Sequence, residues 1–130
     1  MIRDGEVRDD IGLRFVRALG AKDRATLTSL LDPDVEFRGL TPSRSWEASN
    51  PAEVLEILLG SWFESHDHIR ETLEAETDLV AGRDRLHYRF RVENDDGERF
   101  LVEQHGYFDV VDGRIASMSL MCAGFRPLPD

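Results

Sequence analysis

The sequence predicts an α+β domain in which three N-terminal helices pack on a curved, mainly antiparallel sheet. Two observations predict this class. In the first half of the chain apolar residues recur three or four positions apart, as on one side of a helix, whereas from about residue 68 they alternate with polar residues, as in a strand. The 130 residues contain no interior stretch rich in proline, glycine and serine, so we expect one domain.

Three segments of the first half have the helical pattern. The first covers about residues 5–19 and ends at Gly20, a frequent C-terminal cap. The second, about 27–31, must end before Pro33, because a proline ring disfavours a helical conformation in the preceding residue. The third, about 50–63, opens with an Asn-Pro pair suited to a helix start, and its apolar side is too wide for a surface helix.

The strands are predicted from alternation. A short strand over Val35–Phe37 is followed by a loop, residues 41–49, in which Trp46 has no core periodicity to explain it and could cover a pocket. The longer strands are expected at about 69–79, 86–92, 100–110 and 114–124.

Strand register decides which side chains share a face of the sheet. The turns at 95–97 and 111–113 can each be a two-residue or a three-residue loop, and the choice turns a strand over. Three-residue loops place Phe90 opposite Val102 rather than opposite a glutamate, so we adopt them. The predicted inner face then carries Leu86, Tyr88, Phe90, Val92, Phe100, Val102, Gln104, Gly106, Phe108, Met118, Leu120 and Cys122.

The same register places Tyr88 opposite Gln104, and Gln104 opposite Leu120. Tyr88 and Gln104 are the polar side chains on the inner faces of their strands, and buried polar groups need partners. Two interpretations stay open: the pair is hydrogen-bonded within the core, or it orients a polar atom of an otherwise apolar ligand.

Charge and cysteine content restrict the partners. The chain has 26 acidic and 16 basic residues, a formal charge of −10, which repels a nucleic-acid backbone and an anionic membrane, so we expect neither as a partner. The single cysteine, Cys122, cannot form an internal disulfide, and the first residues contain no apolar run. We therefore expect a cytoplasmic protein.

The order of elements, together with the segment 108–115, Phe-Asp-Val-Val-Asp-Gly-Arg-Ile, resembles the nuclear transport factor 2-like superfamily. This superfamily includes ketosteroid isomerases, SnoaL-like polyketide cyclases and limonene epoxide hydrolases. The resemblance covers nearly the whole chain and implies a SnoaL-like, cone-shaped barrel over residues 1–130. The proline-dense residues 126–130 are expected to form a flexible tail. It also implies that the concave sheet face and the helices enclose a pocket.

The catalytic residues of these enzymes do not carry over. The resemblance places Phe15 where a ketosteroid isomerase has its oxyanion-hole tyrosine and Phe37 where it has its proton-shuttling aspartate. The remaining acid falls on Gly106 or His105, and the epoxide hydrolases' carboxylate on the last strand falls on Leu120. The cyclases' aspartate has no inner-face match on the three final strands. The catalytic residues are therefore unknown, and whether the chain is an enzyme is left open.

We predict a mostly apolar pocket for a small, ring-containing molecule. The candidate ligand-binding residues are Phe15, Phe37, Trp46, Trp62, Tyr88, Phe90, Gln104, Phe108, Met118, Leu120 and Cys122. The alternative function is an isomerase, cyclase or hydrolase acting on a small apolar cyclic substrate. The candidates for its acid or base are Tyr88, Glu36, Glu71 and His66.

The segment 64–68, Glu-Ser-His-Asp-His, holds several possible zinc ligands, but no further ligand is identifiable elsewhere, so we expect no metal and no cofactor. On the outer face His87 lies opposite His105, and Arg89 opposite Glu103. Such a mixed surface is typical of interfaces, and the resemblance adds that this face pairs two subunits. We expect a homodimer, and a purely associating domain is the third candidate function.

Overall fold

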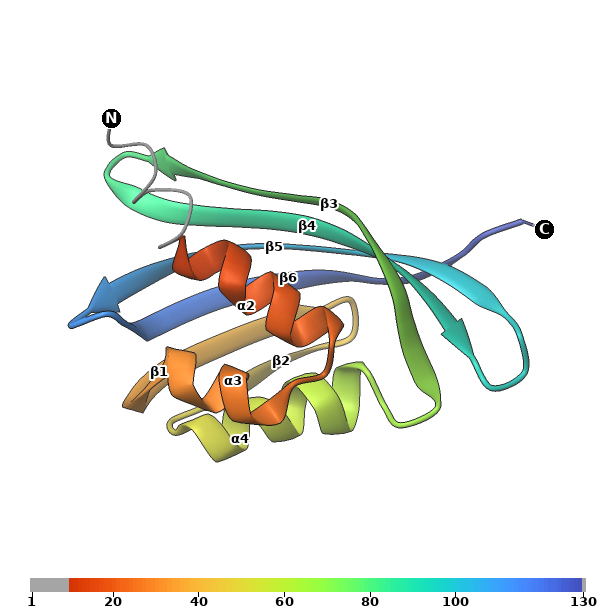
Figure 1. The fold of residues 1–130 in the computed structure, drawn as a ribbon, viewed down its shortest axis with the longest axis horizontal. Helices are drawn as coiled ribbons and strands as arrows, with labels where there is room; N and C mark the ends of the chain where they lie inside the picture. Colours follow the sequence, from red (N-terminus) through yellow and green to blue (C-terminus); the bar gives the residue numbers. More distant parts are fainter. Residues whose placement is uncertain (1–9, 130) are drawn as a thin grey trace.

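The computed structural model describes residues 10–129, which form an α+β domain (Figure 1). Its elements are α2 (Ile11–Gly20), α3 (Arg24–Leu30), β1 (Leu31–Thr41), β2 (Arg44–Ala48), α4 (Pro51–Leu55), the π-helix η1 (Glu56–Trp62), β3 (Asp67–Val80), β4 (Arg83–Asn94), β5 (Arg99–Val111) and β6 (Arg114–Pro127). The expected start of the first helix, at about residue 5, lies outside the described residues.

The six strands form one sheet in the order β2-β1-β6-β5-β4-β3, in which β1 and β6 are parallel and all other neighbours are antiparallel. The helices cover one face of this sheet (Figure 1). The predicted class, helices and mainly antiparallel pairing are confirmed. The expected barrel is not closed, because β2 and β3 are edge strands that do not pair with each other.

The helices begin where their capping residues stand. The side chains of Asp10, Asp23 and Asn50 accept hydrogen bonds from the first turns of α2, α3 and α4, at 2.9–3.1 Å. The third predicted helix starts at Pro51, as expected, and continues as η1. Its wide apolar side is fully used, since Val54, Leu55, Ile57, Leu58, Leu59, Trp62 and Phe63 are all buried.

The β1–β2 hairpin corrects the sequence analysis. Strand β1 is longer than Val35–Phe37 and begins at Leu31, which we placed in a helix. Its ladder to β6 is interrupted between Leu31 and Glu36, around Pro33, which has no N–H to donate. The expected loop 41–49 is wrong: a turn at residues 42–43 leads into β2, which pairs with the edge that β1 would otherwise leave open.

The β4–β5 register is confirmed, since Tyr88 lies opposite Gln104 and Phe90 opposite Val102. The β5–β6 register is wrong by two residues, because Gln104 lies opposite Cys122 and not Leu120. A two-residue turn, with φ of 53° at Asp112 and 79° at Gly113, accounts for one residue, and a bulge at residues 109–110 for the other. This even shift keeps Leu120 and Cys122 on their predicted inner face. A second bulge, between the Val102 and Gln104 pairs, sets Val102 opposite Phe125, three residues beyond its predicted partner.

The edge strand β3 and the C-terminal end of β6 also differ from expectation. Leu73 and Leu79 of β3 are exposed, because bulges near residues 70 and 73 break the alternation of this edge strand. Arg126 and Pro127, expected in a tail, pair with β5, and the N–H of Leu128 donates to the Arg99 carbonyl at 2.9 Å.

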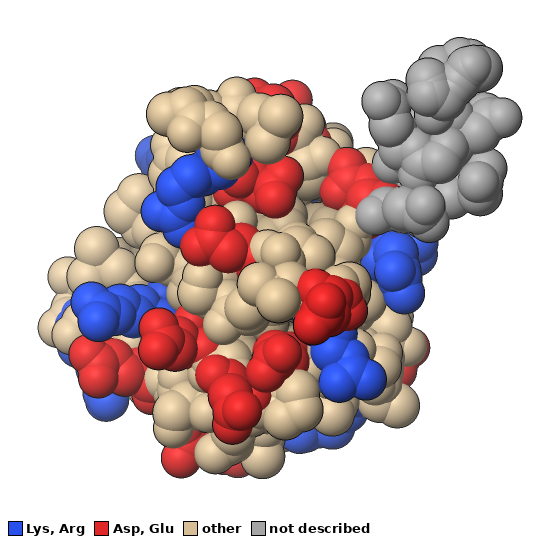
Figure 2. Space-filling view, turned by 90° about the vertical axis from the view of Figure 1, so that its left-hand side faces the viewer, with Lys and Arg blue, Asp and Glu red and all other residues tan. Residues whose placement is uncertain are grey.

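Figure 2 views the molecule from the left-hand side of Figure 1. Acidic side chains are spread over this face, and the basic ones lie in separate places between them. Residues 10–129 therefore form no continuous basic surface on this face of the kind that holds a nucleic-acid backbone. None of the helices in residues 10–129 is long and apolar enough to span a membrane.

We predict that Gly106→Ala will destabilise the fold. A Cβ at Gly106 would lie 2.1 Å from the backbone oxygen of Ser119, so β5 and β6 would have to separate. We expect a loss of about 3 kcal/mol in the free energy of unfolding, measured in urea. Gly20→Ala is the control, because a Cβ there meets its nearest neighbour, Thr72 Oγ1, at an ordinary 3.5 Å. Equal stability of both variants would contradict the close approach.

Candidate functional site

A cavity of about 430 Å³ opens where η1 leads into β3. This volume is within the range of sites for small molecules. It is lined by Thr41, Trp46, Ser61, Trp62, Glu64, His66, Asp67, Asn94, Phe100, Cys122, Gly124 and Phe125. The wall thus combines aromatic side chains with a polar edge.

The position of Trp62 shapes the aromatic wall. Its indole lies against β1 at Gly39, where a Cβ would come within 2.7 Å of the ring. It packs against Phe37 and meets Trp46 edge-on, with ring centroids 6.2 and 6.3 Å away. The indole N–H of Trp46 donates to Thr41 Oγ1 at 3.0 Å, whereas that of Trp62 is buried and has no partner among residues 10–129.

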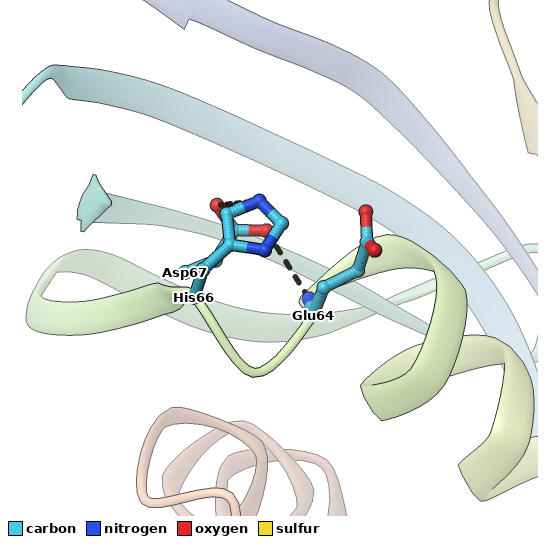
Figure 3. Close-up of side chains that lie close together, drawn as sticks. All are labelled: Glu64, His66 and Asp67. Carbon is cyan, nitrogen blue, oxygen red and sulfur yellow. Dashed lines mark hydrogen bonds and ion pairs between the residues drawn. The ribbon is translucent and has the colours of Figure 1, made fainter. Parts of the chain in front are cut away.

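Three ionisable residues form the polar edge of the cavity: Glu64, His66 and Asp67 (Figure 3). Asp67 is 6% exposed, and its carboxylate accepts the N–H of Glu64 at 3.1 Å. His66 Nε2 lies 3.6 Å from Asp67 Oδ1. The donor atoms of the three residues lie within 4.8 Å of one another, close enough to share one cation.

Lys22 holds this turn in place. Its ammonium group donates to the carbonyl oxygens of Glu64 at 2.8 Å and of Asp67 at 2.5 Å, which links the α2–α3 turn to the turn before β3. Burial lowers the pKa of Lys22, and the charge of Asp67 acts in the opposite direction. A second group with metal-ligand spacing, Glu74, Glu76 and His87, lies on the sheet, and Glu76 and His87 line a separate hollow there.

The structure divides the predicted ligand-binding residues into two sets. Trp46, Trp62 and Cys122 line the cavity, and Trp46 does so from β2 rather than from a loop. The rest lie in the packed core, at most 2% exposed: Phe15, Phe37, Tyr88, Phe90, Gln104, Phe108, Met118 and Leu120. Large side chains therefore fill the inner part of the space under the sheet, and the open cavity lies at its end.

Tyr88 and Gln104 contact each other as one of the two interpretations requires. The Tyr88 hydroxyl donates to Gln104 Oε1, and neither side chain is exposed. Burial raises the pKa of Tyr88 well above its usual value, so the phenol stays protonated and donates. Among the other acid–base candidates, Glu36 and Glu71 are exposed outside the cavity, and His66 lines it.

The remaining cavity residues were not in our candidate set. Phe100 was predicted on the inner face and could have been found from the strand pattern. Phe125 is out of phase with the inward residues Leu120 and Cys122, and a register shift between the Val102 and Gln104 pairs brings it inward, so alternation alone could not find it. Ser61, Glu64, Asp67 and Asn94 come from a helix end and from turns, where no periodicity signals a pocket.

The model of the SnoaL-like domain family matches residues 13–118. The chain belongs to this family. No curated protein matches it. The SnoaL-like domain also resembles solved structures at low identity, which shows the shared fold.

Three of these structures illustrate the likeness. A protein from Rhodopseudomonas palustris, described as a proposed isomerase, is 16% identical, with TM-score 0.68, over 85% of this chain and 87% of that one. An LEH-like epoxide hydrolase from M. tuberculosis is 16% identical, with TM-score 0.60, over 87% and 83%. A Xanthomonas campestris protein of unknown function with a cystatin-like fold is 21% identical, with TM-score 0.64, over 88% of each chain.

We predict that Tyr88 and Gln104 stabilise the fold as a pair. Tyr88→Phe leaves the buried amide of Gln104 without a partner and should cost about 1 to 3 kcal/mol. Adding Gln104→Leu removes the unpaired amide and should restore part of that loss, as measured by urea unfolding of the single and double variants. A further loss of stability in the double variant would contradict the pairing.

Proposed function

We propose that this SnoaL-like domain binds a small, mostly apolar, ring-containing molecule in the cavity beside η1. The observation that carries the proposal is the cavity itself, whose wall contains four aromatic side chains, Trp46, Trp62, Phe100 and Phe125. Aromatic side chains offer large apolar surfaces against which a ring packs. Trp46, Trp62 and Cys122 are the predicted ligand-binding residues that can touch such a molecule.

The reaction is unassigned. The structural relatives described as an isomerase and an epoxide hydrolase support a small-molecule ligand, but Phe15 and Phe37 offer no group for proton transfer and are closed off in the core. If the bound molecule is converted, His66 is the acid–base candidate placed to exchange a proton with it. The core residue Phe37, which packs against Trp62, then acts by positioning the wall.

Ser61→Phe tests the cavity, because Ser61 is exposed and lines it from η1. The added ring should occupy the space and lower the affinity for ring-containing fragments at least about tenfold, as measured by ligand-observed NMR. Ser29→Phe, a change at an exposed serine of α3, should leave the affinity unchanged. Equal affinities in the two variants would place the ligand elsewhere.

We also propose that the outer sheet face forms a homodimer. Leu40 of β1 and Met121 of β6 pair there and are 50% and 47% exposed, which supplies an apolar centre beside the charged pairs of β4 and β5.

The single buried thiol of Cys122 supports the proposed cytoplasmic location, where such thiols stay reduced.

Light scattering should return about twice the chain mass of 14.8 kDa. Met121→Glu places a charge at the centre of the proposed interface and should give a monomer. Leu79→Glu introduces the same charge at an exposed leucine near the β3–β4 turn, outside the proposed interface, and this variant should remain dimeric. A monomeric unmodified chain, or a dimer that persists in Met121→Glu, would rule out this interface.

A further inference from the structure

The cavity differs from the sheet surface in how its carboxylates are paired. On the strands, arginines reach carboxylates at short distances: Arg70–Glu93, Arg83–Asp109, Arg85–Asp78, Arg89–Glu103 and Arg91–Glu71, all at 2.5–3.3 Å. The cavity lining contains two carboxylates and no arginine or lysine. The cavity lining is therefore acidic, in contrast to the arginine–carboxylate pairs of the strands.

Glu64 is the carboxylate left without compensation. The Lys22 ammonium contacts the backbone carbonyls of both Glu64 and Asp67, but the carboxylate that acts on it is that of Asp67, and His66 Nε2 also lies 3.6 Å from the Asp67 carboxylate. Within residues 10–129 the Glu64 carboxylate has neither an ion pair nor a hydrogen bond, although it stands at the edge of the cavity (Figure 3). A positive group in the cavity would meet this carboxylate directly.

The aromatic wall attracts the same kind of group. Trp46 and Trp62 meet edge-on, and Phe100 and Phe125 do so with centroids 5.6 Å apart. The face of an aromatic ring carries partial negative charge and attracts a cation within about 6 Å. Residues 10–129 already use this attraction twice, since the guanidinium carbons of Arg44 and Arg83 lie 3.7 and 5.8 Å from the ring centres of Trp46 and Tyr107.

We propose that the ligand of this cavity is an organic cation, a ring-bearing amine or quaternary ammonium ion. This inference rests on the proposed function and names its ligand class. The ring packs among the four aromatic side chains, and the ammonium group faces Glu64. Anionic molecules are disfavoured, because no lining residue offers a permanent positive charge.

The chain contains a built-in reporter for the test. Its two tryptophans, Trp46 and Trp62, both line the cavity, so intrinsic tryptophan fluorescence reports on this site alone. The probes are para-hydroxyphenyltrimethylammonium and para-tert-butylphenol, which have nearly the same shape and the same hydroxyl group but differ by one positive charge. We expect the cation to bind about tenfold more tightly near neutral pH and low salt.

A charge-removing variant locates the attraction. Glu64→Gln should lower the affinity for the cation about fivefold and leave that for the neutral phenol unchanged. Glu56→Gln is the matched control, since it removes the same charge from an exposed position of η1 outside the cavity. It should retain the full preference for the cation. Melting temperatures of both variants show whether the fold is intact.

The outcomes separate the two proposals. If the neutral phenol binds as tightly as the cation, or if Glu64→Gln loses no more cation affinity than Glu56→Gln, the ligand class is wrong while a ring-binding cavity stands. If neither probe alters the fluorescence up to millimolar concentration, the proposed function itself is contradicted, and the ligand class with it.

Discussion

The contact between Trp62 and the backbone of β1 at Gly39 decides where the cavity lies. The indole can approach the sheet because residue 39 has no side chain, and η1 delivers it there at the end of a helix whose apolar residues are otherwise committed to the core. A π-helical turn is wider than an α-helical one and often marks a functional site. With Trp62 against β1, Trp46 of β2 closes one side of the space and β6 the other.

The sequence predicted which side chains of the strands point inward, but it did not predict the β5–β6 register or strand β2, and each failure has a physical reason. Alternation placed Tyr88 opposite Gln104, because a single slip would have set an aromatic ring against a charge. The two-residue turn and the bulge at Asp109 and Val110 left no such mark, because together they move β6 by two residues and keep Leu120 and Cys122 inside. Strand β2 was missed for a related reason: Pro42 and its serine neighbours indicate a loop locally, but the open edge of β1 needs backbone partners.

The sequence predicted which side chains point inward, but it could not predict how much space these side chains leave for a ligand. Alternation shows that Phe90 and Phe108 point inward, yet whether inward side chains leave a space depends on how closely the helices approach, and no periodicity encodes that distance. Helix α2 brings Phe15 against the sheet and the inner space is filled, which leaves the opening at the helix end. Lys22 shows the same limit. As the sole lysine it was visible in the sequence, but its contacts reach across more than forty positions of the chain.

The net charge of the chain is a poor guide to the electrostatics of its cavity. Arginines cancel carboxylates across neighbouring strands, where side chains directly opposite one another are close enough to pair. The turn before β3 lies outside the paired strands, so no arginine from a neighbouring strand forms an ion pair with Glu64 at the cavity edge. The same turn is fixed from behind by Lys22, which bonds backbone carbonyls and leaves the carboxylate side free. Local architecture, rather than composition, therefore sets the sign of the charge that a ligand meets.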